Sequence, residues 1–261
     1  MDKISIVTVV FNMKEEFKET IENILSQTYD NLEIIIIDGG STDGTVDVIK
    51  KYDHKIAYWV SESDKNLYHA MNKGIIKASG KWINFMNAGD LYYDTNVIEN
   101  VFANSDYKEA DLLIGKSIIQ YDEFRRRYQN GNLSEIWKGS IFKHQSCFIK
   151  TEFQRLNLYN ENNRISADFE FFFNTIEISK ARTCNLNNII SIYSAGGLSD
   201  KKRIEALMAN FRLVQNTFRF SPKVFSFYFL NILKETLKFV VKIVLPKNAI
   251  KVIQKYMHGN K

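Results

Sequence analysis

The stretch EIIIIDGGSTDGT, residues 33–45, decides the fold. Its four consecutive isoleucines are typical of a strand that is buried on both faces of a parallel sheet. The two glycines that follow allow a sharp turn, and Thr42 or Asp43 could cap a helix running to about Tyr52. Ligands of open α/β sheets bind beyond the carboxyl ends of the strands, so Asp38 is expected to face a binding crevice.

Strand-like and helix-like patterns alternate around this stretch. Apolar runs predict strands at 4–10, 33–38, 56–60 and 81–86, and helical spacing predicts helices between them at 17–25, 43–52 and 68–78. This alternation predicts right-handed crossovers and an α/β fold, in which helices flank a Rossmann-like, mostly parallel sheet.

The pattern changes after about residue 110. Three further strands are predicted at 111–121, 146–150 and 188–194, and one helix is predicted at 168–180. The strands could form a second, mixed part of the same sheet. The triplet Arg125–Arg127 is typical of a solvated loop. We therefore expect one domain over residues 1–200, with halves 1–105 and 106–200, and a helical region over residues 201–261.

Charge is distributed unevenly between these regions. Residues 1–200 carry a net charge of −6, whereas residues 201–261 carry +11. Cys147 and Cys184 are isolated thiols, which favours a reducing compartment and argues against a structural zinc or a disulfide framework. The amino-terminal run is typical of a first strand and not of a signal peptide.

The segment INFMNAGD, residues 83–90, ends an apolar run with a single carboxylate, Asp90. Mg²⁺ or Mn²⁺ bound with a nucleoside diphosphate takes several oxygens from phosphate and water, so one protein carboxylate suffices. Asn87 could add an amide oxygen or bond a ribose hydroxyl, and Gly89 would let a diphosphate approach closely. Asn, Gly and Asp are also ordinary turn formers, and that alternative stays open.

Two further segments carry polar side chains at the expected amino-terminal ends of helices. Asp64 and Asn72, together with Tyr68, could line the end of the helix at 68–78, whereas His69 is interpreted as structural. Asp168 lies in the first turn of an aromatic helix after Ser166. Such a carboxylate could interact favourably with the helix dipole, or it could serve as a general base.

The carboxyl-terminal region combines apolar residues with spaced lysines. Lys234, Lys238 and Lys242 interrupt the apolar run 225–245, which is therefore not expected to span a membrane. A basic stripe opposite large aliphatic side chains is typical of a helix that lies in an anionic membrane interface. A solvated face packed on the first domain or at a dimer interface is the alternative, and nucleic acid is not an expected partner.

Taken in order, these segments resemble the family 2 glycosyltransferases, which have the GT-A fold. The similarity is greatest to the bacterial surface-polysaccharide branch, of the colanic-acid type. The matching blocks span about residues 1–198: ISIVTVVFN, LEIIIIDGGSTDGT, SESD, YHAMNKGI, INFMNAGD, KHQS and SADFEFFF. Residues 66–69 read Asn-Leu-Tyr-His where that branch commonly has Gly-Ile-Tyr-Asp, so no donor-sugar preference is carried over.

The resemblance implies roles for the donor-binding residues. Thr8 and Val10 match positions that hold the nucleotide base, and Asp38 matches the acid that pairs with it. Asp64 matches an acid near the nucleoside. We group Asn72 with these residues.

The resemblance also implies roles at the reaction centre. Asp90 matches the metal-binding acid that ends an Asp-x-Asp-like motif, and Asn87 takes the first position of that motif. Asp168 matches the general base that deprotonates the acceptor hydroxyl. His144 and Gln145 match a pair near the donor sugar or the acceptor.

The expected activity is an inverting, metal-dependent transfer of sugar from a nucleotide-diphosphate sugar to a saccharide hydroxyl. The expected acceptor is lipid-linked, in surface polysaccharide, O-antigen or capsule synthesis at the cytoplasmic face of the inner membrane. Two alternatives are a sugar nucleotidyltransferase and a non-catalytic, membrane-associated nucleotide-sugar-binding scaffold. A homo-oligomer stays open.

Overall fold

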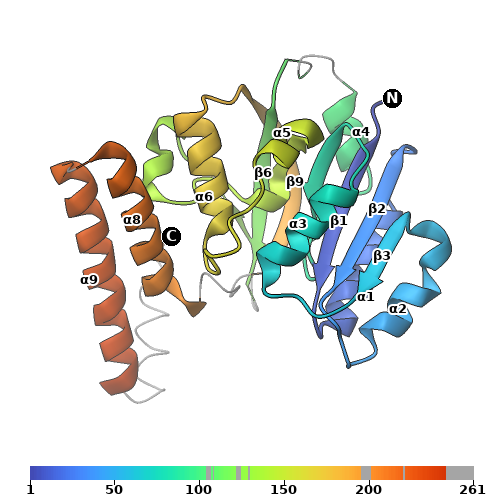
Figure 1. Ribbon diagram of the computed structural model, residues 1–261, viewed down its shortest axis with the longest axis horizontal. Coiled ribbons are helices and arrows are strands. Elements are labelled where there is room, and N and C mark those ends of the chain that lie inside the picture. Colours follow the sequence, from blue (N-terminus) through green and yellow to red (C-terminus); the bar gives the residue numbers. More distant parts are fainter. Residues whose placement is uncertain are drawn as a thin grey trace. The chain divides into compact units, whose positions relative to one another are not determined.

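The computed structural model describes residues 1–103, 107, 109–121, 125–128, 130–194, 201–219 and 221–244. The chain divides into two compact units, residues 1–197 and residues 198–261. The first unit is built on one mixed sheet, in which the described residues form nine strands (Figure 1).

The sheet has a parallel half and a mixed half. In the parallel half, the order is β3 (Tyr58–Ser61), β2 (Leu32–Asp38), β1 (Ile4–Val10) and β4 (Trp82–Phe85). In the mixed half, the order continues with β8 (Cys147–Lys150), β6 (Leu112–Gln120), β9 (Thr183–Ser194) and β5 (Leu91–Tyr92), and β7 (Arg125–Tyr128) pairs with β6. Because β8 runs antiparallel to both β4 and β6, it joins the two halves. The predicted α/β fold is confirmed.

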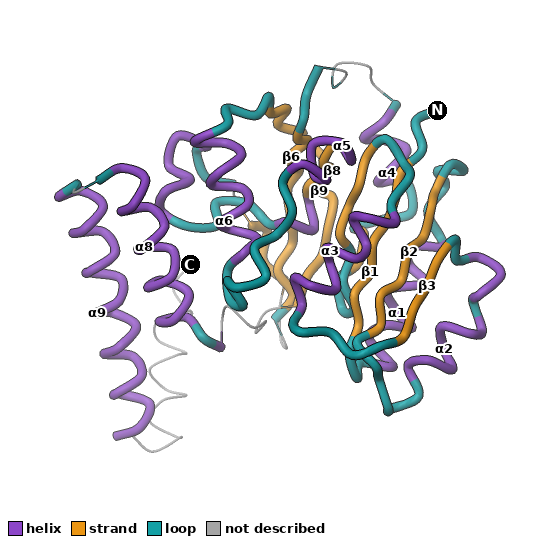
Figure 2. The backbone as a smooth tube through the Cα atoms, in the orientation of Figure 1, coloured by secondary structure: helices purple, strands orange, loops and turns teal. Residues whose placement is uncertain are grey.

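Helices cover both faces of this sheet (Figure 2). The α-helices of the first unit are α1 (Lys14–Leu25), α2 (Thr45–Lys51), α3 (Leu67–Lys77), α4 (Val97–Phe102), α5 (Thr151–Leu156) and α6 (Ala167–Phe173). The helical segments of other types are the 3₁₀ turns η1 (Asp53–Lys55), η2 (Leu133–Lys138) and η3 (His144–Ser146) and the π-helical η4 (Asn174–Ile178).

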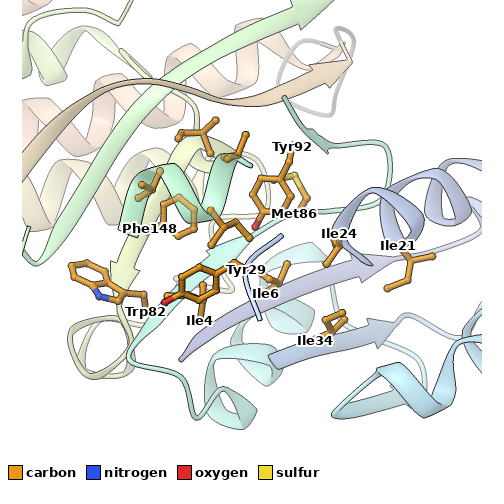
Figure 3. Packing of buried hydrophobic residues seen from close by; sticks show 14 of the residues in the cluster. Ile4, Ile6, Ile21, Ile24, Tyr29, Ile34, Trp82, Met86, Tyr92 and Phe148 are labelled. Carbon is orange, nitrogen blue, oxygen red and sulfur yellow. The ribbon is translucent and has the colours of Figure 1, made fainter. Parts of the chain in front are cut away.

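The core explains which helices cover which face. Ile6 of β1 belongs to the main buried cluster together with Ile21 of α1 and Ile98 of α4 (Figure 3). Val7 instead faces Gly74 of α3, where an added Cβ would lie only 2.3 Å from Val7 Cγ1. Successive side chains of a strand point to opposite faces, so α1 and α4 cover one face and α3 covers the other.

Several elements differ from their predicted form. The strand β5 and the helices α4 and α5 were not predicted, because each is six residues or shorter and carries little periodicity. The predicted loop at Arg125–Arg127 is wrong, since these residues lie on β7 and pair with β6. The strand predicted at 188–194 begins at Thr183, because β6 offers a long partner edge.

The second unit contains α8 (Arg203–Phe218) and α9 (Pro222–Val244). Tyr228 of α9 is fully buried, and its ring centroid lies 5.5 Å from that of Phe211 of α8. Neither these helices nor any other helix of the described residues combines the length and the hydropathy that crossing a membrane requires. The lysine spacing of α9 is repeated in the sequence at Lys247, Lys251 and Lys255, which the sequence predicts to form a second basic stripe and which lie outside the described residues.

Candidate active site

Asp38 ends β2 and is fully buried. Its carboxylate accepts hydrogen bonds from the backbone N–H groups of Gly40 and Ser41 and from the hydroxyls of Ser41 and Ser61. Gly40 has φ +83°, a left-handed conformation that glycine adopts readily. Asp38 therefore orders the loop after β2, and a contact between this carboxylate and a nucleobase stays a prediction that requires one of these bonds to exchange.

Asp43 follows in the same loop and connects two helices. Its carboxylate accepts hydrogen bonds from the backbone N–H of Thr45 at 3.0 Å and from that of Lys14 at 3.0 Å. These residues begin α2 and α1, so one exposed acid satisfies an unpaired N–H at each helix start. The predicted capping role of Asp43 agrees with these contacts.

Thr8 and Val10 lie on β1 next to this loop, and both side chains are buried. Val10 packs within the main core cluster, whereas Thr8 Oγ1 has no hydrogen-bond partner among the described residues. Both side chains are almost inaccessible to solvent. The predicted contact of these residues with a nucleotide base stays a prediction.

Asp64 precedes α3 and forms a charged cluster with side chains of that helix. Its Oδ1 lies 2.7 Å from Lys73 Nζ and 2.7 Å from His69 Nδ1, and Lys73 also pairs with Glu62 at 2.6 Å. The other oxygen, Asp64 Oδ2, is buried without a hydrogen-bond partner in the part of the chain that the structure describes. His69 is thus held by Asp64, in agreement with the structural role predicted for it.

Asn72 of α3 holds a neighbouring loop. Its Nδ2 donates to the backbone carbonyl of Tyr159 at 2.9 Å, and its Oδ1 accepts from the N–H of the same residue at 2.9 Å. Both ends of the amide are therefore occupied by one peptide segment. The amide thereby fixes the loop that leads to α6, and the predicted contact between Asn72 and the nucleotide sugar stays a prediction.

The NAGD turn is fixed by α1. Gly89 has φ +92°, and its N–H donates to Thr20 Oγ1 at 2.9 Å. The Thr20 hydroxyl lies 3.0 Å from the backbone carbonyl of Asp90, to which it can donate. A Cβ on Gly89 would meet no atom closer than 3.7 Å, so glycine is required here for its backbone conformation more than for space.

Asp90 is a buried carboxylate at the end of this turn, with an exposed fraction of 7%. Gln145 Nε2 donates to Asp90 Oδ1 at 3.1 Å. Burial raises the pKa of Asp90 to about 6, although the positive charge of His144 and the bond from Gln145 oppose the rise. A cation at this carboxylate would favour its ionised form.

The surroundings of Asp90 fit a hard cation. Two buried amide oxygens beside it, Asn87 Oδ1 and Gln145 Oε1, lack a hydrogen-bond partner among the described residues. The residues that the structure describes contain no cluster of three or more His, Cys, Asp or Glu side chains that could hold a metal. Mn²⁺ or Mg²⁺ accepts carboxylate and amide oxygens and takes its remaining ligands from phosphate and water.

Asp168 lies in the first turn of α6, and 27% of its side chain is exposed. Tyr68 Oη donates to Asp168 Oδ1 at 3.0 Å, and His144 Nδ1 lies 3.7 Å from Asp168 Oδ2. Burial raises the pKa of Asp168, but the neighbouring His144 and the hydrogen bond from Tyr68 outweigh it, so the pKa lies below its ordinary value. This acid is therefore ionised at neutral pH.

One short turn connects the two carboxylates. In η3, His144 contacts Asp168, and the next residue, Gln145, donates to Asp90. His144 Nε2 also lies 3.5 Å from Asn87 Nδ2. The structure thus brings together five of the predicted residues from three distant segments.

Two residues of the site carry contacts that the sequence did not indicate. The bond from Tyr68 to Asp168 spans 100 positions of the chain. Thr20 occupies the buried face of α1 with Phe17, Ile21 and Ile24. A polar side chain on that apolar stripe was the only sequence signal of its role.

Comparisons with known proteins identify the family of the chain. The family model described as "Glycosyl transferase family 2" matches residues 5–173. The PGL/p-HBAD biosynthesis glycosyltransferase of Mycobacterium tuberculosis (strain ATCC 25177 / H37Ra) is 27% identical over 229 residues, which cover 80% of this chain and 85% of that protein. Glycosyltransferase GlyG of Streptococcus pneumoniae serotype 4 is 33% identical over 123 residues, or 46% of this chain and 40% of that protein.

Solved structures share the fold at low identity. Mannosyltransferase PcManGT from Pyrobaculum calidifontis, in complex with GDP-Man and Mn²⁺, has a TM-score of 0.66 and 16% identity and covers 98% of this chain and 79% of its own. S. aureus TarS 1-349 in complex with UDP-GlcNAc has a TM-score of 0.64 and 15% identity and covers 82% of this chain and 67% of its own. The chain belongs to glycosyl transferase family 2 and has the GT-A fold.

Proposed function

We propose that this glycosyltransferase moves a sugar from a nucleoside-diphosphate sugar to a saccharide hydroxyl and inverts the anomeric centre. The observation that carries the proposal is the pair of carboxylates connected by η3. Asp168 is partly exposed at the start of α6, whereas Asp90 is buried beside two amide oxygens that lack partners among the described residues, so the two acids suit different tasks. The fold relatives that bind UDP-GlcNAc and GDP-Man support a nucleotide-sugar donor.

Asp168 acts as the general base in this proposal. Its ionised carboxylate accepts the proton of the acceptor hydroxyl while the acceptor oxygen attacks the anomeric carbon. Attack from the face opposite the departing nucleotide inverts that carbon in a single displacement. The hydrogen bond from Tyr68 and the contact with His144 orient the carboxylate for this transfer.

Asp90 binds the metal in this proposal, together with the amide oxygens of Asn87 and Gln145. A bound Mn²⁺ or Mg²⁺ would offset the charge that develops on the departing diphosphate. The left-handed backbone of Gly89 shapes the turn that carries Asn87 and Asp90. His144 and Gln145 position both acids from one turn.

The acceptor is proposed to be a lipid-linked saccharide of surface polysaccharide, O-antigen or capsule synthesis. Support comes from α9, where exposed side chains include Phe229, Leu230, Leu233 and Leu237. Lys234 and Lys238 add positive charge to the same helix. A helix with this composition suits an anionic membrane surface, which would place the enzyme at the cytoplasmic face of the inner membrane.

Release of nucleotide from a panel of activated sugars, with and without Mn²⁺, tests the enzymatic proposal. Asp168→Asn should lower transfer by about 10²–10⁴-fold, the usual contribution of a general base. Asp47→Asn, an exposed acid in the first turn of α2, is the matched control and should retain activity. Near-normal transfer by Asp168→Asn would refute the base assignment, and no release from any donor would favour a non-catalytic scaffold.

Flotation with vesicles tests the membrane proposal. Wild-type protein should float with phosphatidylglycerol vesicles and much less with phosphatidylcholine vesicles. The double variant Lys234→Gln/Lys238→Gln should lose this preference, whereas Lys50→Gln/Lys55→Gln, exposed lysines of the first unit, should keep it. Equal flotation of both double variants would argue against a basic membrane-binding face on α9.

A further inference from the structure

A pocket lies directly against the proposed base. Asp168, His144 and the exposed Ser140 form its polar side, and apolar side chains from three segments form its other walls. Ile136 comes from η2, Ile141 and Phe142 come from the segment before η3, and Phe172 comes from α6. A hydroxyl that loses its proton to Asp168 would therefore sit at the mouth of an apolar pocket.

The apolar walls are mostly buried, and their side chains carry no hydrogen-bonding group. Ile136, Phe142 and Phe172 have exposed fractions of 1%, 4% and 5%. The rings of Phe142 and Phe172 pack edge to face with centroids 4.8 Å apart. Ile141 is only partly buried, so it is the wall residue that a bound group could contact without moving the core.

The chemistry of this lining narrows the group that it can bind. No lysine or arginine is among the described lining residues, so a phosphate would find no partner there. A sugar hydroxyl placed against the apolar walls, away from Asp168, His144 and Ser140, would lose its hydrogen bonds to water without replacement. A methyl group would instead gain by leaving water.

We infer that the pocket binds a methyl substituent adjacent to the reacting hydroxyl of the acceptor sugar. Two common classes of sugar supply such a methyl group, 6-deoxyhexoses and 2-acetamido sugars. The inference rests on the proposed function, because it takes Asp168 as the base that receives the acceptor proton. What the inference adds is that Ile141 and its apolar neighbours select the acceptor.

Matched pairs of octyl glycosides test the inference with the donor that releases nucleotide. The pairs are D-rhamnoside and D-mannoside, D-fucoside and D-galactoside, and N-acetyl-D-glucosaminide and D-glucoside, each with the same anomeric configuration, and the first two pairs are also tested in the L series. We expect kcat/KM to favour the methyl-bearing member of at least one pair by about 10-fold or more, the range that one methylene-sized group gives in an apolar pocket. A preference within the first two pairs identifies a 6-deoxyhexose, and a preference within the third identifies an acetamido sugar.

Substitution of the wall then assigns the preference to the pocket. Ile141→Ser should reduce the preference to about 3-fold or less, while Ile76→Ser, an isoleucine 62% exposed on α3, should leave it unchanged. Acceptor-independent nucleotide release and the melting temperature are measured for both variants. Unchanged release shows that the donor site and the fold are intact when acceptor preference is lost.

Two results would overturn the inference. One is equal kcat/KM within every pair for the wild-type enzyme. The other is a full preference retained by Ile141→Ser and also by Ile141→Phe, which should fill the pocket. Absence of nucleotide release from any donor would instead refute the proposed function, so the two failures are distinguishable.

Discussion

Removal of the Tyr68 hydroxyl should separate orientation of the base from binding of the donor. Tyr68 is 4% exposed and donates to Asp168 Oδ1 at 3.0 Å. Burial and the charge of Asp168 hold the pKa of Tyr68 well above its usual range, so the hydroxyl keeps the proton that it donates. A hydrogen bond to a charged group contributes about 1.5–3 kcal/mol, which corresponds to roughly 10–150-fold in rate.

The expected loss for Tyr68→Phe lies at the lower end of that range. Because 27% of the Asp168 side chain is exposed, water can replace part of the lost bond. We therefore expect kcat to fall about 10–30-fold at pH 7, with the KM of the donor unchanged within about 2-fold. Loss of the Tyr68 hydroxyl also raises the pKa of Asp168. The acidic limb of the pH–rate profile therefore moves to higher pH, but the base stays ionised at pH 7.

Tyr159→Phe is the matched control for this experiment. Its hydroxyl is buried but has no hydrogen-bond partner among the described residues, and its ring lies 5.6 Å from that of Tyr68. Steady-state transfer at saturating Mn²⁺, with the melting temperature of each variant, provides the comparison. The reasoning is refuted if Tyr68→Phe keeps at least half of the wild-type kcat, or if Tyr159→Phe loses as much activity.

Three further predictions concern stability. Burial raises the pKa of Glu33, but its hydrogen bonds outweigh burial and bring the pKa to about 2. Glu33→Gln should therefore lower the unfolding free energy at pH 7 by roughly 3 kcal/mol, and urea titrations should show this difference shrinking as pH falls from about 4.5 towards 2. Gly74→Ala should cost about 1–3 kcal/mol, because its Cβ would lie 2.3 Å from Val7 Cγ1, and an unchanged melting temperature would contradict this packing. Gly89→Ala should cost about 1–2 kcal/mol through φ +92° alone, and calorimetry should show a larger loss than for Gly89→Asn, since Asn tolerates left-handed backbone.

The parallel half of the sheet could be predicted from the sequence because its signals are local. The isoleucines of β2 and the apolar spacing of α1 each occupy one continuous segment, and the observed strand Leu32–Asp38 begins one residue before its predicted start. The mixed half was less predictable. Strands such as β5 and β7 depend on the edge that another strand offers, and that edge is formed by residues far away in the chain.

The site divides in the same way. The sequence by itself determined the candidates Asp90 and Asp168, since each acid ends or begins an element whose periodicity is visible. Only the tertiary structure decided the hydrogen-bond partners of the site residues. Asn72 bonds a loop, Asp38 accepts bonds from its own turn, and Tyr68 donates to Asp168. The physical reason is that hydrogen-bond partners and burial, which set both orientation and pKa, come from segments separated by as many as 100 residues.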